Sequence, residues 1–194
     1  MDNKSLEKLA RGIHHCQRCE RSQTRKYTVP GEGNPNSGML LLGEAPGRKE
    51  DKTGRPFVGR AGDYLEKILS LHHLDRNQVF ITSVLKCYHP QSPKKTQIEE
   101  CLSWSFGQIE LLNPKLILVM GRWAAWAFLD LNTLKDSPKV LTREGRTWIV
   151  TCHPAAAMRF PARDREFRKG FKIFASNAAE LDLWRAPSPK TKGK

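Results

Sequence analysis

The stretch that decides the fold runs from Met39 to Gly59 and reads MLLLGEAPGRKEDKTGRPFVG. Four apolar residues in succession at 39–42 fit a strand that is covered on both faces, as in a parallel sheet. The glycines and prolines that follow fix the path of a loop rather than fill a core. Because open α/β sheets bind ligands beyond the carboxyl ends of their strands, we expect this loop to form the wall of a pocket.

The rest of the chain alternates apolar runs with segments of helical periodicity. Further strands are expected at 79–85, 116–120 and 148–151. Helices are expected around 6–13, 64–69, 96–112, 123–129 and 164–182, and Thr96 with Glu99 resembles a capping box. This alternation predicts an α/β three-layer sandwich with a central, mostly parallel four-stranded sheet and helices on both faces, whose strand order the sequence does not reveal. We expect one domain over 1–183 and a disordered basic tail over 184–194.

The charge of the chain points to a polyanionic partner. Thirty-three Lys and Arg against twenty Asp and Glu give a net charge of +13, which favours nucleic acid over an acidic metabolite. A basic protein without such a partner is the alternative. No apolar run approaches the roughly 20 residues that span a bilayer, and Met1 to Lys4 lacks the apolar core of a secretory signal. We therefore expect a cytoplasmic protein with no membrane partner.

Five cysteines in a reducing compartment are better candidates for metal ligands than for disulfides. Cys16 and Cys19 have the C-x2-C spacing with which two thiolates grip one metal centre.

The glycine loop matches neither standard phosphate cradle. It lacks G-x-G-x-x-G, and the residues from Gly43 to Lys49 do not satisfy the P-loop pattern. Carboxylates at Glu44, Glu50 and Asp51 would also repel a phosphate. A nucleotide cofactor is therefore disfavoured, and a solvated acidic turn is the structural alternative.

Several motifs together resemble one family. Residues 43–47 and 50–62 closely resemble the first motif of the iron–sulfur (family 4) uracil-DNA glycosylases, and residues 84–87 and 151–156 resemble the other two hallmarks. The resemblance spans roughly residues 5 to 180. It implies a DNA repair enzyme that flips a deaminated base, first of all uracil, out of DNA and hydrolyses its N-glycosidic bond, leaving an abasic site. We expect the protein to be a monomer.

The resemblance also implies a cofactor. The family holds a [4Fe-4S] cluster on four cysteines, which map here onto Cys16, Cys19, Cys87 and Cys101. Zinc also accepts four thiolates and remains an alternative. Cys152 is left over, and we expect it to be a small apolar filler at a strand end.

By the same resemblance, the base would contact Gly43, Ala45, Phe57 and Ser83. Phe57 would stack on the flipped pyrimidine, although ordinary core packing is the alternative for this ring. His153 would stabilise the charge that collects on base oxygen O2 as the bond breaks. We expect these two rings to stand on opposite sides of one cleft, with the base between them.

The hydrolytic water and the DNA backbone need further residues. Glu44, or the backbone beside Ala45, would position water, and Glu50 is a second carboxylate candidate. Met158 or Arg159 would fill the gap that the flipped base leaves in the stack. Phosphates would be gripped by a basic face that includes Arg159, Arg163, Arg165, Arg168 and Lys169.

One residue departs from the family pattern. Members usually carry asparagine where this chain has Ser83, and a hydroxyl reads a base edge less specifically than an amide does. Hypoxanthine or xanthine could then be substrates, or the chain could be a DNA-binding relative with weak catalysis. A zinc-stapled nucleotide hydrolase on a similar sheet is an alternative from another class.

Overall fold

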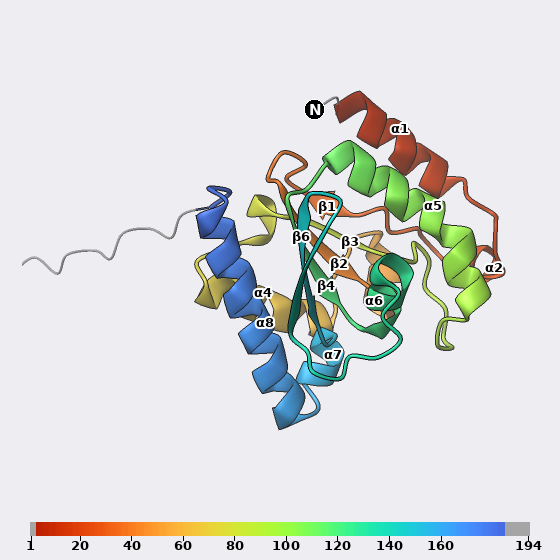
Figure 1. Ribbon diagram of the computed structural model, residues 1–194. Coiled ribbons are helices and arrows are strands. Elements are labelled where there is room, and N and C mark those ends of the chain that lie inside the picture. The colour runs from red at the N-terminus through yellow and green to blue at the C-terminus, as the bar shows by residue number, and fades with distance from the viewer. Residues whose placement is uncertain (1–2, 185–194) are drawn as a thin grey trace, which may run out of the picture.

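The structure of the chain, a computed structural model, describes residues 3–184. All of the predicted basic tail except its first residue therefore lies outside the described residues. The described part forms three layers, with one central sheet and helices on each of its faces (Figure 1).

The sheet has six strands in the order β1-β3-β2-β4-β6-β5. The four central strands are parallel to one another, and each edge strand is antiparallel to its neighbour. The strands are β1 (Glu32–Gly33), β2 (Met39–Gly43), β3 (Phe80–Ser83), β4 (Leu116–Met120), β5 (Lys139–Arg143) and β6 (Arg146–Thr151).

The prediction of four strands was therefore wrong, although the four predicted strands form the parallel centre. Both missed strands are edges. β1 has only two residues, and β5 is half exposed and carries no continuous apolar run. A sequence pattern based on burial does not detect such strands.

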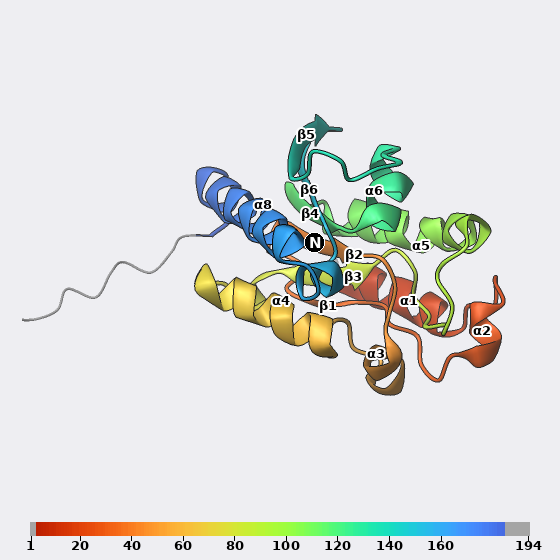
Figure 2. The same cartoon turned by 90° about the horizontal axis from the view of Figure 1, so that it is seen from below.

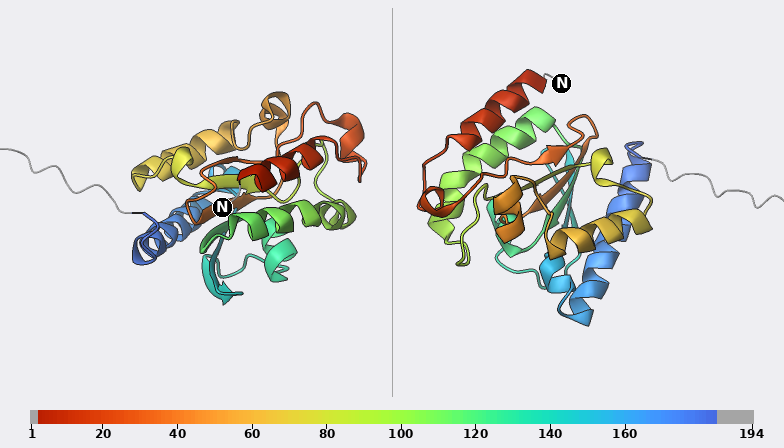
Figure 3. Two further views of the ribbon diagram at one scale, coloured as in Figure 1. Left: turned by 90° about the horizontal axis from the view of Figure 1, so that it is seen from above. Right: turned by 180° about the vertical axis from the view of Figure 1, so that it is seen from behind.

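Two groups of helices bury the two faces of the sheet. One face is covered by α4 (Arg60–Leu71) and α8 (Pro161–Glu180), and the other by α1 (Asn3–His14), α5 (Lys95–Leu112) and α6 (Arg122–Leu129), as Figures 2 and 3 show. The alternation along β2 fits this arrangement, because Leu41 packs into the first core and Leu40 and Leu42 into the second. The remaining helices are short: α2 (Arg21–Thr24), α3 (Arg48–Thr53), the 3-10 helix η1 (Arg76–Gln78) and α7 (Pro154–Ala157). No described helix is long and apolar enough to cross a membrane.

The predicted start of the helix at 96–112 is shifted by one residue. The helix begins at Lys95, and its N-cap is Lys94, whose backbone N–H donates to Gln97 Oε1 at 3.1 Å. The proposed box of Thr96 and Glu99 is therefore wrong, because both side chains lie inside the first turns. The reason is that the side-chain amide of Gln97, at the third helical position, accepts the backbone N–H of the N-cap residue. The side chain of the N-cap residue is therefore not needed.

The parallel centre places three loops on one edge of the molecule. The segments after β2, β3 and β6 all leave the sheet at its carboxyl edge, since these strands run in the same direction. The expectation that these loops share one rim is confirmed by a cavity that residues from all three of them line.

Candidate functional site

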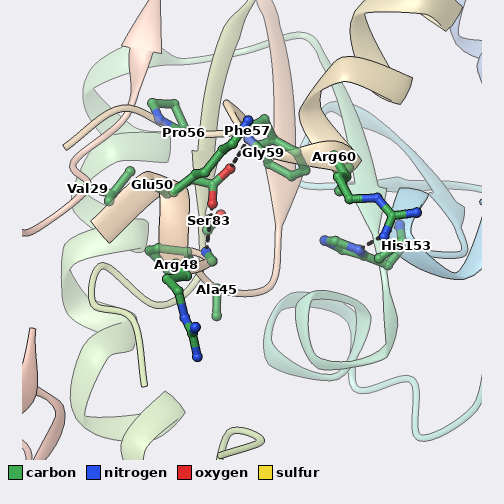
Figure 4. A pocket seen from close by; sticks show the side chains of 15 residues that line it. Val29, Ala45, Arg48, Glu50, Pro56, Phe57, Gly59, Arg60, Ser83 and His153 are labelled. Atoms are coloured by element: carbon green, nitrogen blue, oxygen red, sulfur yellow. Dashed lines mark hydrogen bonds between the residues drawn. The ribbon is translucent and has the colours of Figure 1, made fainter. Parts of the chain in front are cut away.

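A cavity of about 430 Å³ opens at this carboxyl edge (Figure 4). The predicted residues Ala45, Glu50, Phe57, Ser83 and His153 all line it. The predicted residues Gly43 and Glu44 are not among its lining residues and lie directly before Ala45. The site thus unites side chains from the first loop, the end of β3 and the segment after β6.

Phe57 is held in an unusual conformation. Its φ of 50° lies in the left-handed region, which a bulky residue rarely adopts. Gly43 makes room for the ring, because a Cβ there would come within 2.5 Å of it. The Arg76 guanidinium donates to the carbonyl oxygens of Pro56, at 2.7 Å, and Phe57, at 3.2 Å. The surrounding contacts therefore fix both the ring and the backbone of Phe57.

Gly62→Ala tests this support. A Cβ at Gly62 would lie 1.8 Å from the Phe57 carbonyl oxygen, so the loop must move. In an ordinary helix interior the change would stabilise by up to ~1 kcal/mol. Here we expect the free energy of unfolding to fall by about 2 to 4 kcal/mol, measured by urea denaturation.

Gly107→Ala on α5 is the matched control, because its Cβ would meet only Leu9 at 3.4 Å. Equal stability changes in the two variants would show that the Phe57 loop is not constrained.

His153 is fixed by its own backbone turn. It is the N-cap of α7, and its Nδ1 accepts a hydrogen bond from the Ala155 N–H at 3.2 Å. Since Nδ1 is an acceptor, the neutral ring carries its proton on Nε2. Burial lowers the pKa of His153 to about 4. At neutral pH the cavity wall therefore holds an uncharged imidazole with a donor at Nε2.

The rings of Phe57 and His153 touch each other. Their centroids are 5.9 Å apart and their planes differ by 26°. A flat molecule between them would need two contact gaps of roughly 3.5 to 4 Å each, or about 7 to 8 Å in total. The expectation that a base lies between the rings is therefore wrong. The two rings form one continuous wall instead of two opposite sides of a cleft, because they stack against each other at this separation.

The two candidate carboxylates have different surroundings. Glu44 Oε1 accepts the Trp123 N–H at 2.8 Å, so this carboxylate caps the N-terminus of α6. Gly121 permits the approach, since a Cβ there would lie 2.5 Å from Oε1. Burial nevertheless raises the pKa of Glu44, although the α6 amides and the Arg122 charge oppose this.

Glu50 binds the backbone at both ends of its loop. Its Oε1 accepts the N–H groups of Val58, at 2.8 Å, and Gly59, at 2.7 Å, and its Oε2 accepts the Gly47 N–H at 3.1 Å. Three backbone donors thus share the two oxygens of this one carboxylate. These contacts give Glu50 the role of organising the loop.

Basic side chains at the mouth of the cavity were not predicted. Arg48, Lys49 and Arg60 line it, and Figure 4 shows Arg48 and Arg60 on different sides. Their place within or directly beside the glycine-rich segment was the available signal, but cations in the first turn of a helix usually face solvent.

The predicted DNA-contacting residues follow His153 along the chain. Met158 is 37% exposed, and Arg159 is exposed beside it. Arg163 pairs with Glu166 at 2.5 Å, and Arg168 pairs with Asp164 at 2.9 Å, so two charges of the predicted basic face are partly compensated.

The four predicted metal ligands come together. Cys16, Cys19, Cys87 and Cys101 line one small cavity, although they belong to three separate segments. Cys16 and Cys19 lie between α1 and α2, Cys87 follows β3, and Cys101 is on α5. Cys152 packs in the core below α8, as expected for an apolar filler.

Donors and cations surround these sulfurs. The Trp104 indole N–H donates to Cys16 Sγ, and Arg25 donates to Cys87 Sγ, both at 3.3 Å. Burial raises the pKa of the Cys101 thiol to about 11, so a bound metal is needed to keep it as a thiolate. Within residues 3–184, no three His, Cys, Asp or Glu side chains stand close enough to share a single metal ion. The two donors suit negatively charged sulfur.

Comparison with known proteins gives a consistent result. The family model of the uracil DNA glycosylase superfamily matches residues 30–175. The type-4 uracil-DNA glycosylase of Pyrobaculum aerophilum is 37% identical, over 94% of this chain and 98% of its own length. That of Archaeoglobus fulgidus is 36% identical, over 87% and 90%. A type-5 uracil-DNA glycosylase of Thermus thermophilus is 31% identical, over 56% and 57%.

Proposed function

The chain belongs to the uracil-DNA glycosylase superfamily, among its type-4 members, and from this premise we propose how its cavity performs uracil excision. The protein is a DNA repair glycosylase that acts on uracil. A glycosylase cannot reach its target bond inside a duplex, so the nucleotide must swing out into a pocket. The observation that carries the proposal is the single cavity lined by Phe57, Ser83 and His153.

The base would stack on Phe57, beside His153 in the wall that the two rings form together. An aromatic contact of this kind contributes about 1 to 3 kcal/mol for each base. Because the two rings touch, the base presents one face to Phe57 and its edge to His153. This pose satisfies the 5.9 Å separation without moving either ring.

Bond cleavage leaves the bonding electrons on the base, where the charge collects on O2. A neutral His153 can donate Nε2–H to this oxygen throughout the reaction, since the Ala155 N–H holds the ring by Nδ1. An uncharged donor suits this task because the neutral imidazole can stabilise the leaving anion through its Nε2–H without any change in its protonation state.

Water completes the reaction by attacking the sugar carbon, and its proton must go to a base. We assign this role to Glu44, which directly precedes the cavity-lining Ala45 and whose pKa is raised by burial. Glu50 stays bound to three amides of its loop and holds Phe57 and its neighbours in place.

Ser83 would read the edge of the base. Its side chain is 3% exposed, and its carbonyl oxygen is occupied by the Lys86 amine at 2.5 Å. Ser83 lines the cavity, and its hydroxyl can serve as donor or acceptor. Because the Ser83 hydroxyl can rotate, it could also form hydrogen bonds with two other deaminated bases, hypoxanthine and xanthine.

Ser83→Asn tests this role. An amide offers a donor and an acceptor in fixed geometry, so we expect the ratio of uracil to hypoxanthine excision to rise by about ten-fold. Single-turnover rates on matched oligonucleotides measure it. Ser83→Ala is the control and should lower the uracil rate. If both variants match the wild type, Ser83 does not contact the base.

For the cofactor, we propose that Cys16, Cys19, Cys87 and Cys101 hold a [4Fe-4S] cluster. The convergence of the four thiols and the donors from Arg25 and Trp104 support it. When bound, the cluster would cross-link the N-terminal segment, the loop after β3 and α5, and hydrolysis requires no electron from it.

DNA would lie across the rim as a substrate of a single-domain monomer. Met158 and Arg159 lie one short helix beyond His153, where a side chain can fill the vacated stack. Arg159 and Arg163 would contact phosphates, together with Arg48 and Arg60 at the cavity mouth.

The direct test is uracil release from a single-stranded oligonucleotide that carries one deoxyuridine. Conversion to an abasic site, detected by alkaline cleavage, is expected, with no cleavage of the matched thymidine strand. Tight DNA binding without any release would instead identify a relative that has lost catalysis.

A further inference from the structure

Two indoles lie one helical turn apart on α6, and a cation covers each. The ring centroids of Trp123 and Trp126 are 6.0 Å apart, with their planes at 88°. The Arg122 guanidinium carbon lies 4.7 Å from the Trp123 ring, and the Lys95 ammonium of α5 lies 4.9 Å from the Trp126 ring. We call these four residues the α6 platform. Trp126 and Lys95 take no part in the chemistry described above, and Trp123 and Arg122 act on it only through Glu44.

The α6 platform begins beside the cavity. The Trp123 N–H binds Glu44, and the next residue, Ala45, lines the cavity. α6 follows β4, which lies between β2 and β6 in the sheet, so it starts on the same rim as the loops of the site. Figures 1 and 2 show α5 and α6 side by side on that part of the molecule. A strand that leaves the cavity on this side must therefore cross α6.

The indoles are only partly engaged in the core. Both are half-buried and pack against the second core by one side, while Arg122 is exposed. Lys95 is 63% exposed at its side chain and pairs with Glu99, the nearby acid, at 3.9 Å. Such a solvent-screened pair contributes little to stability, so Lys95 can change partners readily.

The chemistry of the α6 platform fits single-stranded nucleic acid. Such a strand offers a base to each indole and a phosphate to each cation, so the existing cation–π contacts can be exchanged for stacking and charge pairing. An apolar protein partner would have to bury Arg122 and Lys95, which is costly. The net charge of +13 also favours a polyanion.

We propose that the α6 platform binds unpaired DNA flanking the flipped nucleotide, with Trp126 stacking on a base. This inference rests on the proposed function, because it extends the DNA path from that cavity. It predicts that the protein holds single-stranded DNA more tightly than the cavity mouth alone allows.

Trp126→Ala should bind a 15-nucleotide oligothymidylate, which has no uracil, about ten-fold more weakly in fluorescence anisotropy at low salt. Trp126→Phe keeps a ring and should retain most of the affinity. Lys95→Glu, an exposed change that leaves the core intact, should also weaken binding. Leu71→Ala is the control, since Leu71 is 57% exposed at the end of α4 and lies outside the platform.

Uracil release at saturating DNA should be unchanged in Trp126→Ala, which separates the platform from the chemistry. If Trp126→Ala and Lys95→Glu bind like the wild type, the inference is overturned. If the wild type binds oligothymidylate through the α6 platform but releases no uracil, the proposed function fails and this inference stands.

Discussion

Replacing His153 with alanine should slow uracil release in a single turnover by about 10² to 10³-fold, the usual effect of removing one donor to a developing anion. DNA affinity should change little, because the imidazole meets the base only after flipping. Rapid-quench kinetics give the rate, and anisotropy gives the affinity.

The N-cap contact of His153 calls for a control. His153→Asn can still accept the Ala155 N–H but lacks a donor at the Nε2 position, so it should be as slow as alanine while folding normally. If His153→Asn retains the wild-type rate, His153 acts only as a cap.

The pH dependence follows from the same residue. Because burial lowers the pKa of His153 to about 4, the neutral donor persists from pH 8 to about pH 5, and this residue should impose no loss of rate there. The contribution of His153 to the free energy of unfolding, in contrast to its effect on the rate, does depend on pH. In the unfolded chain the imidazole has a pKa near 6.5 and binds a proton that the buried imidazole of the folded protein does not bind. The free energy of unfolding should therefore fall as the pH drops from 6.5 to 4. His153→Asn should remove this contribution.

The second large effect is expected at the cysteines. Cys101→Ser should purify without iron or visible absorbance and should lose about 3 to 5 kcal/mol of unfolding free energy, comparable to opening a long covalent loop. The cause is that the proposed cluster would join Cys101 on α5 to the segment of Cys16 and Cys19, which lines the same small cavity. Iron analysis and urea denaturation measure the two effects.

Cys152→Ala is the matched control, since Cys152 is equally buried but belongs to the other core. It should retain iron and lose only a packing contribution. Stoichiometric zinc in the wild type would contradict the assignment of the cluster.

The central sheet could be predicted from sequence because its parallel strands are covered on both faces and appear as apolar runs. β1 and β5 could not, since a short or half-exposed edge strand carries no such run. The rim of the site could also be predicted, because parallel strands bring the loops of Ala45, Ser83 and His153 to one edge without knowledge of their order.

The arrangement within the cavity could not be predicted. The contact between Phe57 and His153 depends on a left-handed backbone and on the space beside Gly43, neither of which an apolar pattern encodes. The cap that Glu44 provides for α6 requires β2 and β4 to be neighbours, and strand order was unreadable. The α6 platform was missed for the same reason.

The most direct test is a crystal structure of the protein with abasic-site DNA and uracil. It should show uracil stacked on Phe57, with O2 about 2.7 to 3.1 Å from His153 Nε2 and the opposite edge near Ser83. Uracil bound outside this cavity, or inside it with O2 turned away from His153, would contradict the account.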